Sequence, residues 1–206
     1  MSKQIIGVVD YKVGNLKSIF RTLNNANVNY KMITNYKDFK GCDKFILPGV
    51  GNFGYCTNYL KKTKLDKELI NAAREGKFIY GICMGMQIMF QSSEEAVKSK
   101  GLSLIRGKVK NLQNYFKDQI KIPHIGWNKI FYKKKDNFKK ILDNKYFYFA
   151  NSFICETNDI CNKSYFVYED KKFIASIIKK NIFGTQFHPE ISGKNGLAVY
   201  ERFLKL

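Results

Sequence analysis

The most informative stretch of the sequence runs Phe78-Ile79-Tyr80-Gly81-Ile82-Cys83-Met84-Gly85-Met86-Gln87. Its first half, Phe78–Ile82, is apolar throughout and predicts a buried β-strand, and the residues that follow predict a helix over Met84–Phe90. A cysteine flanked by glycines stands between them, in the G-x-nucleophile-x-G pattern of a sharp strand-to-helix turn. The stretch therefore predicts a cysteine at the N-terminus of a helix, where the helix dipole favours the thiolate.

The same alternation of strands and helices precedes this stretch, whereas the segments after Gly101 are typical of strands joined by short charged turns. Apolar runs that lack a polar face are typical of parallel sheets covered on both faces by helices. No repeat, linker or change in composition divides the chain, so we expect one α/β domain over residues 1–206 with a mixed, mostly parallel central sheet and helices on both faces. The expected strands are Gln4–Val9, Val28–Thr34, Lys44–Leu47, Gln119–Ile122, Tyr146–Ile154, Ser164–Tyr168 and Phe173–Ile178. The expected helices lie around 16–23, capped by Asn15, around 65–73, ended by Gly76, and over Gly196–Phe203.

The composition excludes several classes of protein. The 206 residues are 45% hydrophobic and 15% aromatic, which is too apolar for a disordered chain. No apolar run approaches the ~20 residues of a membrane span, and the N-terminus lacks a signal-peptide pattern, so we expect a cytoplasmic protein that does not contact a membrane. The five cysteines form no C-x-x-C pair, which indicates neither a disulfide framework nor a metal site.

The formal net charge of +19 is compatible with nucleic-acid binding, but lysines supply nearly all of it. Specific recognition of bases or phosphates usually depends on arginine, and no RNA-binding or zinc-finger motif accompanies the charge. A solvated lysine surface is the favoured interpretation, and no nucleic-acid partner is predicted. Salt-dependent DNA binding would support the alternative.

A second segment supplies the partners that a cysteine nucleophile needs. The sequence Gln186-Phe187-His188-Pro189-Glu190 holds one of only two histidines in the chain. If this segment is an extended strand, His188 and Glu190 face the same side. Glu190 would then orient the imidazole, and His188 would act as the base for Cys83. We therefore predict a Cys83–His188–Glu190 triad.

A third segment, Leu47-Pro48-Gly49-Val50-Gly51-Asn52-Phe53-Gly54, follows a predicted strand and contains three glycines. Such a loop lets backbone N–H groups approach a ligand or a developing negative charge. It lacks the G-K-[ST] of a phosphate-binding loop. Next to a thiol nucleophile it is a candidate for half of an oxyanion hole, whose other half would be the N–H of Met84.

These three segments, together with Pro123-His124-Ile125-Gly126-Trp127-Asn128, resemble the class I (triad-type) glutamine amidotransferases over nearly the whole chain. Within that family the chain is most similar to the glutaminase subunits of imidazole glycerol phosphate synthase. The resemblance implies a flavodoxin-like core and the hydrolysis of L-glutamine to glutamate and ammonia through a cysteinyl thioester, with no cofactor. It implies an oxyanion hole at Val50 and Met84. The implied substrate-binding residues are Gly49, Gly51, Gln87, Asn151, Ser152 and Phe153.

The resemblance also implies a partner that consumes the ammonia, a (β/α)8-barrel cyclase that forms a heterodimer with this chain in histidine biosynthesis. Asn15, Pro123, His124 and Trp127 match family positions near that interface. The chain departs from the family at Asn151, where histidine is usual. That departure leaves open a related glutaminase subunit that feeds a sugar amidotransferase in surface-polysaccharide biosynthesis. A stand-alone cysteine hydrolase is a further alternative, and it predicts full turnover without a partner.

Overall fold

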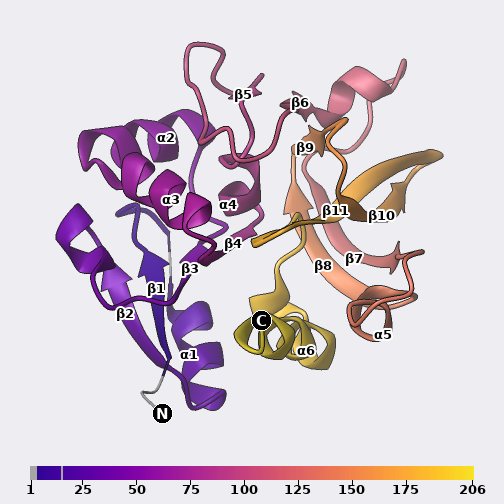
Figure 1. The fold of residues 1–206 in the computed structure, drawn as a ribbon. Coiled ribbons are helices and arrows are strands. Elements are labelled where there is room, and N and C mark those ends of the chain that lie inside the picture. The colour runs from indigo at the N-terminus through magenta and orange to yellow at the C-terminus, as the bar shows by residue number, and fades with distance from the viewer. Residues whose placement is uncertain (1–3, 15) are drawn as a thin grey trace.

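The computed structural model describes residues 4–14 and 16–206. A nine-stranded sheet runs through the molecule in the order β2-β1-β3-β4-β12-β11-β10-β7-β8 (Figure 1). The five strands from β2 to β12 are parallel, and every pairing from β12 to β8 is antiparallel. The bounds are β1 Ile5–Val9, β2 Asn29–Ile33, β3 Lys44–Leu47, β4 Phe78–Ile82, β7 His124–Phe131, β8 Tyr146–Asn151, β10 Asn162–Tyr168, β11 Lys171–Lys179 and β12 Ile182–Thr185. The predicted mixed α/β sheet is confirmed.

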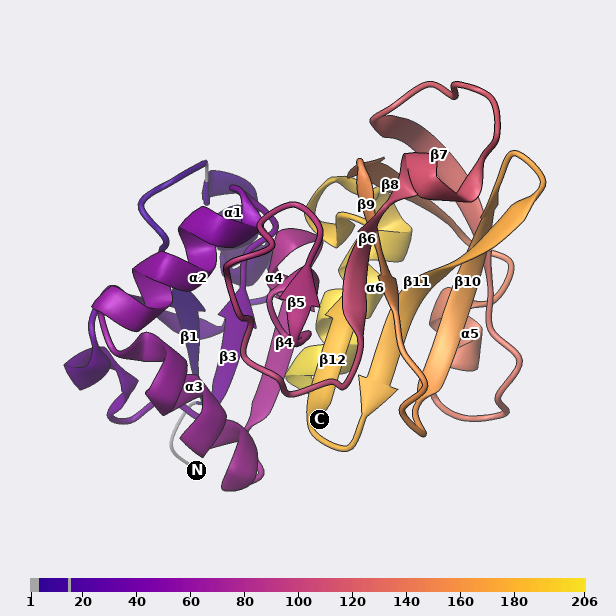
Figure 2. The same ribbon diagram turned by 90° about the horizontal axis from the view of Figure 1, so that it is seen from above.

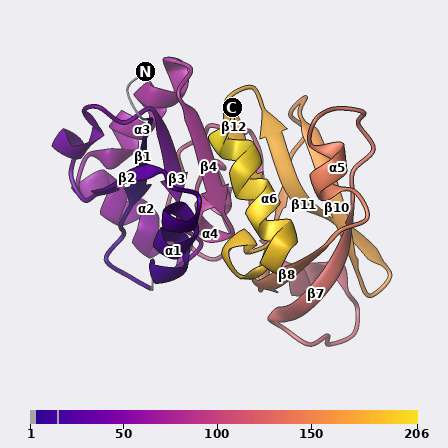
Figure 3. The same ribbon diagram turned by 90° about the horizontal axis from the view of Figure 1, so that it is seen from below.

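Helices cover both faces of this sheet, as its apolar strands require. Figures 2 and 3, seen from opposite sides, show α2 (Phe53–Lys62) and α3 (Leu65–Arg74) over one face and α1 (Lys17–Asn25) and α6 (Gly193–Leu204) over the other. Side chains alternate along the strands, so that Ile79 packs with α2 and α3 while Tyr80 packs with α1 and α6. Each face therefore has its own hydrophobic core.

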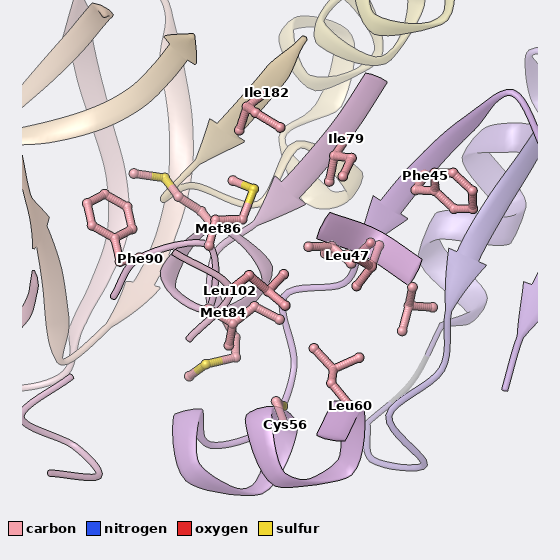
Figure 4. Close-up of a cluster of buried hydrophobic side chains, with 14 of the residues drawn as sticks. Phe45, Leu47, Cys56, Leu60, Ile79, Met84, Met86, Phe90, Leu102 and Ile182 are labelled. Carbon is pink, nitrogen blue, oxygen red and sulfur yellow. The ribbon is translucent and has the colours of Figure 1, made fainter. Parts of the chain in front are cut away.

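The core under α2 extends to the residues that follow β4. Figure 4 shows Cys56 and Leu60 of α2 near Leu47 at the end of β3, with Met84 and Met86 beside them. A small second sheet adds to this core, with the order β5-β6-β9, in which Val109 of β6 and Cys155 of β9 are fully buried. Its strands are β5 Ser92–Ser93, β6 Lys108–Asn111 and β9 Phe153–Glu156. The site described below is thus built on a rigid, packed support.

Two predicted strands are wrong, and both errors lie in the second half of the chain. Residues 119–122 form no strand, because the two isoleucines there pack partly against the core from a loop. Residues 146–154 form two strands instead of one, because the chain leaves the large sheet after Asn151 and enters the small sheet at Phe153. Four further elements were not predicted from the sequence: α2, β7, β12 and the short helix α5 (Lys139–Leu142).

The helix after the cysteine is shorter than predicted. It spans Met84–Gln87 (α4) instead of reaching Phe90. The carbonyls of Ile88, Met89 and Phe90 accept hydrogen bonds from the backbone of residues 102–105, and this loop replaces the next helical turn. No helix in the described part of the chain is long and apolar enough to cross a membrane.

Candidate active site

Cys83 lies on the sharp turn that joins β4 to α4. Its backbone has φ +45° and ψ −103°, a strained conformation for a residue with a side chain. The Cys83 N–H donates to Thr185 O of the neighbouring strand at 2.6 Å, which helps to hold this conformation. A Cβ on Gly81 would meet the Gly85 backbone, and a Cβ on Gly85 would meet the carbonyl of Leu47. The two glycines therefore permit the turn to pack against β3, as the sequence predicts.

The pairing of β4 with β12 brings His188 beside Cys83. Ile82 pairs with Thr185 in parallel register, so the two chains leave the sheet at the same edge. His188 Nδ1 lies 2.8 Å from Glu190 Oε1, and both side chains are largely buried. The prediction that these residues share an extended strand is wrong, because β12 ends at Thr185 and Glu190 lies in a 3-10 turn over Pro189–Ile191. The turn still directs the carboxylate onto the imidazole.

The charge balance of this pair suits a base next to a nucleophile. Burial lowers the pKa of His188, but the charge of Cys83, a hydrogen bond with it and the interaction with Glu190 outweigh burial and raise the pKa above its ordinary value. The net effect favours a proton on the His188 imidazole, so this side chain can take up the proton that a cysteine gives up when it attacks a carbonyl carbon.

Two buried glutamines form a chain of hydrogen bonds that starts at the Cys83 thiol. No role was predicted from the sequence for the one that contacts the thiol, Gln186. Gln186 is fully buried, and its Nε2 donates to Cys83 Sγ at 3.4 Å. Gln87 Nε2 donates to Gln186 Oε1 at 3.3 Å and to Phe153 O at 3.2 Å. The position of Gln186, two residues before His188 on the segment that leaves β12, is the only sequence signal that could have indicated it.

The glycine-rich loop after β3 lies against the catalytic pair. A Cβ on Gly49 would lie 2.9 Å from His188 Cε1 and 3.1 Å from Cys83 Cβ, so only glycine fits between these side chains. Gly51 has φ +100°, in the region that favours glycine. Between them, the carbonyl of Val50 accepts from the thiol of Cys56 at 3.5 Å. The loop is thus close enough to present backbone groups to a substrate bound at Cys83.

The segment that joins β8 to β9 forms another wall of the site. Ala150 O lies 4.0 Å from Cys83 Sγ. Asn151 is buried, and its Nδ2 donates to Phe153 O at 3.1 Å, the same carbonyl that accepts from Gln87. The carbonyl of Ser152 accepts from Leu112 N at 2.9 Å. The structure therefore brings the predicted substrate-binding residues from both sheets to one place.

The predicted interface residues lie on or next to β7, and Asn15 lies outside the described residues. Pro123 and Trp127 are exposed, the latter by 53%, and the Trp127 ring makes an edge contact with Tyr148. His124 is buried, and its Nε2 is 2.7 Å from Asn128 Oδ1. Among the described residues no group of three His, Cys, Asp or Glu side chains is arranged to hold a metal ion.

Comparisons with known proteins agree with this geometry. Residues 7–206 match the family model "Glutamine amidotransferase class-I". The imidazole glycerol phosphate synthase subunit HisH of Bacillus subtilis is 35% identical over 98% of this chain and 96% of its own length. The HisH subunit of Methanocaldococcus jannaschii is 39% identical over 98% of this chain and its entire length.

Solved structures share the fold at lower sequence identity. A crystal structure of a glutamine amidotransferase has a TM-score of 0.75 with 15% identity, covering 97% of both chains. A chain of the PurLQS structure from Thermotoga maritima has a TM-score of 0.73 with 23% identity, covering 98% of both chains. On the family match and on identities of 35% and above across its length, this chain belongs to the class I glutamine amidotransferase family.

Proposed function

We propose that this chain is the glutaminase subunit of an imidazole glycerol phosphate synthase and acts as a single domain over residues 1–206 in the cytoplasm. The observation that carries the proposal is the arrangement of Cys83, His188 and Glu190 on the segments that leave the neighbouring parallel strands β4 and β12 at the same edge of the sheet. HisH relatives at 35–39% identity over 98% of the chain support the assignment to this synthase.

The proposed reaction begins with the attack of Cys83 Sγ on the side-chain amide carbon of L-glutamine. His188 removes the thiol proton and delivers it to the departing nitrogen, which leaves as ammonia when the C–N bond breaks. A thioester between Cys83 and the glutamyl group remains. His188 then takes a proton from water, whose oxygen attacks the thioester and releases glutamate. Glu190 holds the imidazole in place through both steps.

The attack on the amide and the later attack on the thioester each place a negative charge on the carbonyl oxygen, and backbone N–H groups of Val50 and Met84 are proposed to stabilise it. Met84 is the first residue of α4, and the N–H groups in the first turn of a helix have no partner within the helix. One such donor contributes about 3 kcal/mol in comparable sites. Gly49 and Gly51 are proposed to let the Val50 loop approach the substrate.

The glutamine side chain and backbone are proposed to bind between this loop and the β8–β9 junction. Gln87 and Asn151 both donate to the carbonyl of Phe153, and these hydrogen bonds fix the position of the junction. The substrate would therefore contact Ser152 and Phe153 on a support that is tied to the nucleophile through Gln186. No cofactor takes part in the proposed reaction.

The proposed partner is a (β/α)8-barrel cyclase that receives the ammonia in a heterodimer. The exposed Trp127 and Pro123 on the β7 side of the molecule are proposed to contact it, since tryptophan is enriched among residues that dominate binding energy. The alternative acceptor, a sugar amidotransferase, is not favoured, because the relatives named above are subunits of imidazole glycerol phosphate synthase.

The test is ammonia release from glutamine by the purified chain, alone and with the barrel cyclase. We expect Cys83→Ala to abolish release, and Cys161→Ala, which removes a partly buried thiol elsewhere, to keep it. Retention of activity in Cys83→Ala contradicts the mechanism. Full activity without the cyclase contradicts the role as a synthase subunit and favours a stand-alone hydrolase.

A further inference from the structure

A cavity of about 630 Å³ lies away from the catalytic triad, between the small sheet and the β10–β11 hairpin. Figure 2 shows β6 and β9 in front of the large sheet, beside β11 and β10. Its volume falls in the range of pockets that hold small molecules, about 300–1,000 Å³. We propose that this cavity binds a nucleoside phosphate, with the phosphates at its lysines and the base against its apolar wall.

The charge around the cavity is strongly positive. Glu156 is the one carboxylate among its lining residues. Five lysines line it: Lys108, Lys110, Lys163, Lys171 and Lys172. Glu156 is already paired with Lys110 at 3.1 Å. A concave surface lined by charges of one sign concentrates counter-ions of the opposite sign. The cavity therefore attracts anions more strongly than a flat lysine surface does.

Three of these lysines have no carboxylate within 4.0 Å in the part of the chain that the structure describes. Lys108 is exposed at the start of β6. Lys163 Nζ donates to two backbone carbonyls, Thr157 O at 3.3 Å and Asp159 O at 3.2 Å. Lys172 Nζ lies 4.0 Å from the centre of the Tyr165 ring. These ammonium groups keep unpaired charge available for phosphate oxygens.

The inner wall of the cavity is apolar and aromatic instead of charged. Tyr115 and Tyr165 are only partly buried and present aromatic surface to the cavity, with the buried Phe173 and Ile174 behind them at 4% and 8% exposure. An inorganic phosphate would leave this apolar surface unused. A planar base would cover it and stack on an aromatic ring, a contact that tolerates different bases. The combination of lysines and aromatic side chains thus favours a nucleoside phosphate over a free phosphate.

The cavity does not overlap the proposed glutamine site, although one strand serves both. Phe153, at the start of β9, accepts hydrogen bonds from Gln87 and Asn151 on the catalytic side. The rest of β9, from Ile154 to Glu156, lines the cavity. Binding here can therefore be measured without glutamine, so its failure is separate from a failure of the proposed glutaminase activity.

The experiment is calorimetric titration of the full chain with ATP, inorganic tripolyphosphate and adenosine at a fixed ionic strength. We expect ATP to bind at least about fivefold more tightly than tripolyphosphate, because one stacked base contributes at least that factor, and adenosine to bind most weakly. The double variant Lys108→Gln/Lys172→Gln removes two exposed lysines from the cavity and should weaken ATP binding about tenfold. The matched control Lys61→Gln/Lys62→Gln removes the same charge from exposed positions on α2 and should change it less than twofold.

Three results would overturn the proposal. Equal weakening in the two double variants would mean that ATP responds only to the overall charge of the protein. Equal affinity for ATP and tripolyphosphate would exclude the base from the site. Saturable ATP binding that survives Lys108→Gln/Lys172→Gln unchanged would place the ligand elsewhere. The thermal unfolding temperature of each variant confirms that the fold is retained.

Discussion

The hydrogen bond from Gln186 to the nucleophile leads to a prediction that can be worked through in numbers. Gln186→Met keeps the length of the buried side chain and removes the Nε2–H that lies 3.4 Å from Cys83 Sγ. The substitution also removes the acceptor of one hydrogen bond from Gln87, but Phe153 O still accepts from that amide at 3.2 Å. The perturbation is therefore confined to the environment of the sulfur.

A hydrogen bond to a charged group contributes about 1.5–3 kcal/mol, and the long N–S separation places this one at the lower end. About 1.5 kcal/mol less stabilisation of negative charge on sulfur corresponds to roughly a tenfold decrease in a rate that requires this charge. We expect the rate of ammonia release to fall by a similar factor. His188 and Glu190 retain their 2.8 Å contact, so the dependence on the base should not change.

The assay is alkylation of Cys83 by iodoacetamide across a range of pH, followed by mass spectrometry of the peptide that contains it. The expected result is an alkylation rate of Cys83 that is about tenfold lower in Gln186→Met, because the charged sulfur has lost a hydrogen-bond donor. Gln91→Met is the matched control, because Gln91 is exposed and its amide oxygen accepts from Gly107 N at 3.0 Å, away from the thiol. An unchanged alkylation rate in Gln186→Met, or an equal decrease in Gln91→Met, refutes the reasoning.

Three further outcomes are expected. Gly49→Ala places a Cβ 2.9 Å from His188 Cε1, which would displace the imidazole from Cys83 and should lower kcat for ammonia release about 100-fold. A native circular dichroism spectrum with wild-type kcat would contradict this. Burial lowers the pKa of His124 more than its interactions with Asn128 and Asn151 raise it, so the unfolded chain takes up a proton first as the pH falls. The free energy of unfolding should therefore decrease below pH ~6.5. The urea midpoints at pH 7.5 and 5.5 should differ more in wild type than in His124→Gln, and equal differences would show that His124 is not the source of the pH dependence. Trp127→Ala should weaken the complex with the barrel cyclase about 30-fold, or ~2 kcal/mol, in calorimetric titrations, and equal weakening by Val97→Ala, which alters another exposed apolar side chain, would contradict a specific contact.

The parallel half of the fold and its cysteine turn could be predicted from local sequence. The predicted ranges of β3 and β4 match the observed strands residue by residue, because strands buried on both faces have little ambiguity in their pattern. The glycines at 81 and 85 indicate close packing of the backbone at the turn, and the structure shows that a Cβ at either position would meet backbone atoms. The sharp turn at Cys83 thus follows from a short segment of chain, and its conformation is held by the distant Thr185 of β12.

The antiparallel half could not be predicted as well, because distant contacts determine it. The end of α4 depends on hydrogen bonds from residues 102–105, which no local pattern around Phe90 records. The break between β8 and β9 depends on a second sheet that β6 provides. In the site, the spacing of His188 and Glu190 predicted their contact correctly but for the wrong backbone, because a 3-10 turn and a strand can both place such side chains together. Gln186 was missed because a buried amide carries no distinctive sequence pattern.

The position of β12 has a consequence for synthesis of the protein. This strand is the last of the large sheet in chain order, yet it lies at the centre, between β4 and β11. A growing chain that has not passed Thr185 therefore cannot join the two halves of the sheet or bring His188 to Cys83. Folding of this domain depends on contacts between residues about 100 positions apart, which form late and slowly. Partly synthesised chains that end before Thr185 should accordingly lack both the base and the hydrogen bond that helps to hold the cysteine turn, and they should consume no glutamine until the segment through Glu190 has been added.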